Sequence, residues 1–135
     1  AEADALFVRA LAVPQYQDTT RTLLAQGVCQ ARAGKTDEAE RTLVRAYALD
    51  PKNPAIAVNL SEVLYRKGEL ERARFYIRRV NAEPSLVGAQ TLWLAARIEH
   101  KMGNAQGAAD VGEQLRNRVP ESPEATAWAE GRFNE

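Results

Sequence analysis

Small and helix-breaking residues recur along this sequence at nearly constant intervals. Three glycines recur at steps of 34 and 35 residues: Gly34, Gly68 and Gly103. Three alanines follow them at the same steps: Ala39, Ala73 and Ala108. Three prolines recur at steps of 33 and 36 residues: Pro51, Pro84 and Pro120. A repeat of this length restricts the chain to architectures in which one small unit stacks on the next.

A period of about 34 residues with two amphipathic segments per repeat is typical of tetratricopeptide (TPR) helix hairpins. Two helices that cross closely need a small residue at their contact, and a glycine or proline ends each helix. Gly27, Ala39 and Ala46 fill the contact positions in the first complete repeat. The sequence therefore predicts an all-α fold, a right-handed TPR superhelix of antiparallel helix hairpins.

Caps and helix breakers predict about eight helices in a single TPR domain over residues 1–135. Thr36, Asn53 and Ser85 are the expected caps of three of these helices, and Pro14 ends the first. The expected helices cover residues 2–13, 20–33, 37–49, 54–67, 69–83, 85–101, 105–118 and 123–133. They form a half repeat over 1–19, complete repeats over 20–53, 54–88 and 89–122, and a partial terminal helix over 123–135.

The composition excludes several classes of partner. The chain has 18 basic and 18 acidic residues, so no overall charge favours nucleic acid or an anionic membrane. No apolar run is long enough to span a bilayer, and no signal peptide opens the chain. The single cysteine, Cys29, cannot form an internal disulfide, and beside Gly27 on a helix we expect it to be a small packing residue.

The first helix of each TPR hairpin lines the inner, concave surface, so residues at matching repeat positions form rows across it. Aligned on the turn glycines, the rows are Leu24, Val58 and Trp93; Val28, Glu62 and Arg97; Ala31, Tyr65 and His100; and Arg32, Arg66 and Lys101. This predicted groove is an apolar and aromatic strip beside a basic row. Such a surface suits a partner peptide that offers apolar anchors with acidic neighbours.

A second interpretation of the same rows stays open. Within one helical face, periodicity alone does not separate groove positions from core positions. In this alternative, Trp93 is a core residue and the basic row is a solvated helix edge.

Residues typical of catalysis are absent from the sequence pattern. The chain has no glycine-rich phosphate loop, no metal-type cluster of Cys and His, and no nucleophile elbow. Glu99 and His100 are adjacent on one expected helix, so their side chains point about a quarter-turn apart and do not form a catalytic pair. We therefore expect no enzymatic activity, no cofactor and no metal.

The most particular pattern lies in residues 92–124. It consists of Leu-Trp-Leu at 92–94, Arg-Ile-Glu at 97–99, Gly103, Gln-Leu-Arg-Asn-Arg at 114–118, Pro120 and Ser122. This run resembles the C-terminal repeats of the type IV pilus biogenesis and stability proteins, the PilF/PilW pilotin family. The resemblance continues upstream at Thr22, Leu23 and Gly27, whereas Leu24 and Ala25 stand where the family usually carries asparagines.

The resemblance implies an outer-membrane lipoprotein on the periplasmic side, which helps the pilus secretin to assemble or stay stable. The partner would be the secretin or another pilus-assembly component. The lipid-bearing cysteine and the first repeats would precede Ala1, so membrane association would come only from that upstream anchor, and Cys29 would not be the lipidated residue. The chain is then expected to be the C-terminal part of such a protein.

The alternative function is that of a generic cytoplasmic TPR adaptor that binds a peptide. A signal peptide with a lipobox in the upstream coding sequence would distinguish the pilus protein from such an adaptor.

Incomplete repeats at both ends would leave apolar faces around Leu6, Phe7 and Trp128 uncovered. We therefore expect self-association through an end of the chain.

Overall fold

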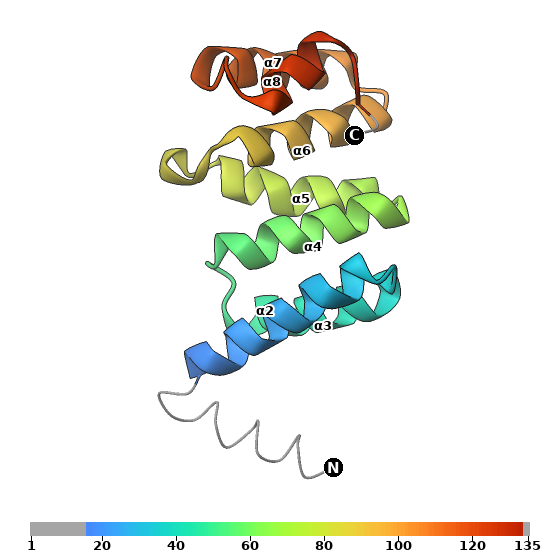
Figure 1. The fold of residues 1–135 in the computed structure, drawn as a ribbon, viewed down its shortest axis with the longest axis vertical. Helices are drawn as coiled ribbons and strands as arrows, with labels where there is room; N and C mark the ends of the chain where they lie inside the picture. Colours follow the sequence, from blue (N-terminus) through green and yellow to red (C-terminus); the bar gives the residue numbers. More distant parts are fainter. Residues whose placement is uncertain (1–15, 134–135) are drawn as a thin grey trace. The chain divides into compact units, whose positions relative to one another are not determined.

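A computed structural model describes residues 16–133, which contain helices and no strand. The α-helices, in chain order, are α2 (Tyr16–Arg32), α3 (Thr36–Leu49), α4 (Pro54–Lys67), α5 (Leu70–Asn81), α6 (Ala89–Lys101), α7 (Ala105–Arg118) and α8 (Pro123–Ala129), with a short 3₁₀ turn η1 (Pro84–Leu86) before α6 (Figure 1). The predicted all-α fold is confirmed. The helix expected over residues 2–13 lies outside the described residues.

The chain divides into two compact units, residues 1–59 (unit 1) and residues 60–135 (unit 2), with the division inside α4. Unit 1 contains the α2–α3 hairpin and the start of α4. Unit 2 contains the rest of α4 and the helices from α5 to α8, with α6 packed against both α5 and α7 (Figure 1). Within the described residues, no helix combines the length and the apolar character that a membrane crossing needs.

The three repeat glycines make the turns that the sequence predicted. Gly34, Gly68 and Gly103 have φ of 81°, 84° and 79°, the left-handed conformation that a side chain disfavours. At the first of these turns, the N–H of Lys35 donates to the carbonyl of Gln30 over 2.9 Å, which closes the last turn of α2. The same pairing recurs at the other two turns, so each hairpin has the same connection.

The α2–α3 hairpin packs through a small residue. A Cβ added at Gly27 would lie 2.6 Å from Cγ of Leu43, so only glycine leaves room for that leucine. Ala39, Leu43 and Ala46 on α3 are fully buried. The small contact positions predicted in this hairpin are therefore occupied as expected.

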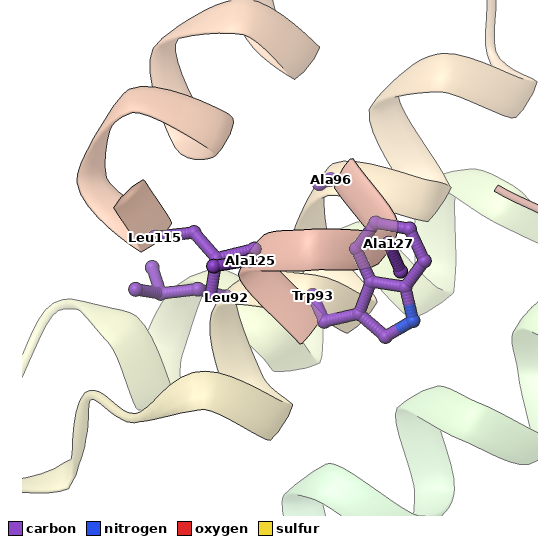
Figure 2. Packing of buried hydrophobic residues seen from close by; sticks show 6 residues of the cluster. All are labelled: Leu92, Trp93, Ala96, Leu115, Ala125 and Ala127. Atoms are coloured by element: carbon purple, nitrogen blue, oxygen red, sulfur yellow. The ribbon is translucent and has the colours of Figure 1, made fainter. Parts of the chain in front are cut away.

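Unit 2 is held together by α6, whose side chains contact helices on both sides. A core cluster joins α6, α7 and α8 and comprises Leu92, Trp93, Ala96, Leu115, Ala125 and Ala127 (Figure 2). In Figure 2 the two leucines lie close to Ala125, and the Trp93 ring lies next to Ala127. The α4–α5 hairpin has a polar contact of its own, in which buried Ser61 of α4 donates a hydrogen bond to the carbonyl of Ala73 on α5 over 2.8 Å.

Some local predictions were wrong. Thr36 is the first residue of α3 instead of its cap, and Lys35 at the cap position makes no side-chain hydrogen bond. The helix expected over 85–101 is broken, because Gly88 is extended (φ −156°, ψ −178°) and α6 begins at Ala89. Thr91 stabilises that start, since its hydroxyl accepts from the N–H of Gly88 over 2.9 Å.

Two further expectations need correction. The last helix ends at Ala129 instead of 133, because Gly131 takes a left-handed turn with φ of 73°. Cys29 is exposed on α2 and is not the small packing residue that its position beside Gly27 suggested. Asn53, Asn104 and Ser122 do cap their helices: each side-chain oxygen accepts from a backbone N–H two or three residues on.

Candidate functional site

Most of the predicted groove residues lie in unit 2, on α4 and α6. We call them the α4–α6 cluster: Glu62, Tyr65, Arg66, Trp93, Arg97, His100 and Lys101. The other predicted groove residues belong to unit 1. Leu24 packs partly buried against the core of that unit, Val28 and Val58 are half-buried, and Arg32 is exposed.

Arg97 links the cluster together. Its Nη2 donates to Oε2 of Glu62 over 3.1 Å, which joins α6 to α4. Its Cζ lies 5.1 Å from the centre of the Tyr65 ring and 5.7 Å from that of Trp93, close enough for cation–π attraction. The side chain is 13% exposed, so water screens these interactions only weakly.

Two more cations lie at the exposed edge of the cluster. Nζ of Lys101 is 5.0 Å from the centre of the Tyr65 ring. Nε of Arg66 is 3.4 Å from Oε1 of Glu62, and half of the Arg66 side chain is exposed. The cluster therefore contains three cations and one carboxylate, and two of these cations are paired with that carboxylate. The net charge of the cluster is positive, which favours an acidic ligand.

Trp93 is the predicted groove residue whose environment differs most from a free surface. It is 7% exposed and belongs to the core cluster between α6 and α8. Of the predicted groove residues on α6, His100 and Lys101 are the exposed ones. Burial of Trp93 corresponds to the alternative interpretation of this residue, in which it is part of the core.

Sequence reasoning missed Phe133, which follows α8 and lies against α6. Its ring stacks on the His100 ring, with centres 4.1 Å apart and planes 13° apart. It also stacks on Trp93, with centres 5.7 Å apart and planes 22° apart. Periodicity carried no signal for this contact, because Phe133 lies beyond the last turn of the repeat pattern.

A buried ion pair supports α6 from the opposite direction, and sequence reasoning missed it too. Arg74 of α5 donates to both carboxylate oxygens of Glu99, over 2.8 and 2.6 Å, and Asn104 donates to Oε2 over 2.8 Å. Glu99 is only 4% exposed. A buried carboxylate needs such partners, so this side chain holds α5, α6 and the following turn in register.

The partners of Glu99 also set its ionisation. Burial is the largest single influence and raises the pKa of Glu99, but the hydrogen bonds from Arg74 and Asn104 and the nearby positive charges together outweigh it. The pKa of Glu99 therefore lies below its ordinary value, and the group is a carboxylate at neutral pH. The Glu99 side chain has a structural role, because its oxygens are already bonded to Arg74, Arg78 and Asn104.

The chemistry of the α4–α6 cluster is that of binding. Aromatic rings, guanidinium groups and one ammonium group offer flat apolar area and hydrogen-bond donors to a peptide. Within residues 16–133 no three His, Cys, Asp or Glu side chains gather in a way that could hold a metal ion.

The helical hairpins and their repeat have the architecture of tetratricopeptide repeats, as the sequence predicted. A family model described as tetratricopeptide repeat matches residues 30–84. No curated protein sequence matches the chain.

Two solved structures confirm the predicted resemblance to PilF and PilW. The structure of PilW, described as a widely conserved type IV pilus biogenesis factor, is 31% identical with a TM-score of 0.76; the match covers 93% of this chain and 57% of PilW. The structure of PilF from Pseudomonas aeruginosa is 22% identical with a TM-score of 0.69, over 92% of this chain and 55% of PilF, and shows the fold. The chain thus spans little more than half the length of either protein.

Proposed function

We propose that this chain is a non-enzymatic binding module of type IV pilus biogenesis. In this proposal it binds a segment of a partner protein, the pilus secretin or another assembly component, and so supports assembly or stability of the secretin. The full protein would be a lipoprotein on the periplasmic side of the outer membrane. The likeness to PilW supports a role in type IV pilus biogenesis, since PilW is described as a biogenesis factor of this system.

The observation that supports the binding surface is the α4–α6 cluster. Residues from the first helices of two successive hairpins meet there, through the 3.1 Å bond between Arg97 and Glu62 and the two cations near the Tyr65 ring. A surface of this kind suits a peptide in which acidic residues flank an apolar one. We propose that the groove residues of unit 1, Leu24, Val28, Arg32 and Val58, bind the same partner.

Charge reversal at Lys101 tests the surface. Lys101 is exposed at the edge of the cluster, so Lys101→Glu should lower the association rate with the secretin's periplasmic region several-fold at low salt, and added salt should remove the difference. Arg118→Glu is the matched control, because Arg118 is exposed on α7 outside the cluster. If Lys101→Glu, Arg118→Glu and the unchanged chain all associate at the same rate, the α4–α6 cluster is not the binding site.

A second variant tests the aromatic part of the surface. Trp93→Ala would disturb the core as well as any binding, because Trp93 is buried. Tyr65 is only partly buried, so Tyr65→Ala is the cleaner change and should mainly raise the dissociation rate. The helical content of each variant, measured by circular dichroism, separates lost binding from lost folding, and pilus formation in cells gives the functional readout.

A further inference from the structure

Phe133 occupies a slot that α6 forms for a flat ring. Its ring is stacked on both His100 and Trp93, which lie seven residues apart and therefore on the same face of α6. His100 is exposed and Trp93 is buried, so the slot has one wall open to solvent and one wall in the core. Arg97, between these two residues in sequence, lies over the Trp93 ring and carries the positive charge.

A single turn places Phe133 in this slot. After α8, the N–H of Gly131 donates to the carbonyl of Trp128 over 3.0 Å, and the N–H of Arg132 donates to that of Ala127 over 2.9 Å. This pairing and the left-handed φ of Gly131 form a Schellman motif, which reverses the chain toward α6. The Phe133 ring stacks on two aromatic side chains and packs against the core cluster, and a ring from another molecule could stack on the same two side chains.

We propose that Phe133 occupies the position in which an aromatic side chain of a partner peptide binds, and that this peptide binds by displacing the Phe133 ring. The peptide would carry one phenylalanine or tyrosine with acidic residues on either side. Its ring would stack between His100 and Trp93, and its carboxylates would lie near Lys101 and Arg66, the exposed cations of the cluster. This inference rests on the proposed function, because it specifies the ligand of the α4–α6 cluster.

The simplest probe is a short blocked peptide, Gly-Glu-Phe-Glu-Gly, with two matched peptides that carry leucine or alanine at the centre. Binding to the 135-residue chain is measured by calorimetry. If Phe133 fills the slot in about 90% of molecules, Phe133→Ala should bind the phenylalanine peptide about tenfold more tightly, because the site is then always open. The leucine peptide should gain less and the alanine peptide nothing, since they lack a ring to stack.

Phe75→Ala is the matched control. Phe75 lies on α5 outside the cluster and is 53% exposed, so the same substitution there should leave peptide affinity unchanged. Gly131→Ala is a second way to open the slot: it disfavours the turn while it keeps the Phe133 ring, and a Cβ at Gly131 would meet no other atom. It should raise affinity for the phenylalanine peptide by a smaller factor than Phe133→Ala does.

His100 is the only histidine in the chain, so its ring protons report on the slot without ambiguity in NMR spectra. In the unchanged chain, the stacked Phe133 ring should shift these signals upfield. The shift should disappear in Phe133→Ala, return when the phenylalanine peptide is added, and stay absent with the leucine peptide. This readout needs no stability measurement and separates ring stacking from a general change in folding.

The results decide between two roles for Phe133. Tighter binding of the phenylalanine peptide by Phe133→Ala and Gly131→Ala, with the His100 shift restored, supports a displaceable ring. If the affinity of both variants equals that of the unchanged chain, or if no peptide binds either, Phe133 is only a core residue and the proposal is wrong. Because the probe contains no pilus component, this outcome leaves the secretin test of Lys101→Glu unaffected, and failure of that test leaves the peptide result standing.

Discussion

The α2–α3 hairpin and the α6–α7 hairpin place their smallest residue on opposite helices. In the first hairpin, Gly27 on α2 makes room for Leu43 of α3. In the second, the position that matches Leu43 is Gly112 on α7, and a Cβ there would collide with the indole of Trp128 on α8. The comparison shows that a repeat position is set by the volume its neighbour requires. In the α6–α7 hairpin, Trp128 of α8 contacts α7, and the glycine is therefore found on α7.

The two hairpins also differ in one polar position. Gln30 on α2 accepts a hydrogen bond from Thr42 over 2.7 Å, whereas the matching residue on α6 is Glu99, which is paired with Arg74. A neutral contact within a hairpin is thus replaced by an ion pair between α5 and α6. Changes at these matched positions give the largest expected difference between the two regions.

Glu99→Ala should lower the free energy of unfolding by about 2–3 kcal/mol, because it leaves the Arg74 guanidinium without its carboxylate. This loss of unfolding free energy is smaller than for a fully buried ion pair, since the Arg74 side chain is 25% exposed. Gln30→Ala should cost about 1 kcal/mol, the contribution of a neutral hydrogen bond. Urea denaturation of both variants measures the difference, and equal losses would contradict a special role for the ion pair.

Ala73→Leu should destabilise the protein by about 2 kcal/mol, because Ala73 is fully buried in unit 2 and its carbonyl bonds Ser61. Ala109→Leu is the control, since Ala109 is exposed on α7 and leucine fits there. Melting temperatures of the two variants test whether the alanine row is a packing row. An unchanged melting temperature for Ala73→Leu would show that the predicted register is not what determines packing.

Gly112→Ala should cost about 1 kcal/mol or more, because the rigid Trp128 ring must move and this outweighs the helix propensity that alanine gains. Gly27→Ala should also destabilise the protein, because the added Cβ would lie 2.6 Å from Cγ of Leu43, which is fully buried. In a Trp128→Ala background the sign at Gly112 should reverse, and Gly112→Ala should stabilise. A cost that persists without the tryptophan ring would contradict the role of Trp128 in the comparison.

The smallest expected effect is on pH dependence. The pKa of Glu99 is lower in the folded protein than in the unfolded chain, so its stabilising contribution is present at neutral pH and declines as pH falls through the folded value. The difference in unfolding free energy between the unchanged chain and Glu99→Gln should therefore narrow below about pH 4. Gln30→Glu, which puts a carboxylate at the matching position of α2, serves as the comparison. A difference that is constant from pH 7 to pH 3 would contradict the lowered pKa.

The turns and the contact positions of the hairpins were predictable because they depend on local geometry. A left-handed turn requires glycine at Gly34, Gly68 and Gly103, and a close helix crossing requires a small residue such as Gly27 or Ala73. The start of α6 was mispredicted because Ser85 looked like a cap and the break at Gly88 leaves only a weak local signal. Ser85 instead donates to the carboxylate of Glu83.

The repeat spacing, the caps and the helix breakers were thus enough to predict a TPR fold and the helices from α2 to α7 to within a few residues. Packing in three dimensions decided the rest: the burial of Trp93, the pairing of Arg74 with Glu99, and the stacking of Phe133 on His100. The physical reason is that caps, turns and helical periodicity act over a few residues, and the repeat copies the same local pattern along the chain. The contacts that packing decided join side chains 25 or more residues apart in sequence, whose meeting depends on how neighbouring helices pack.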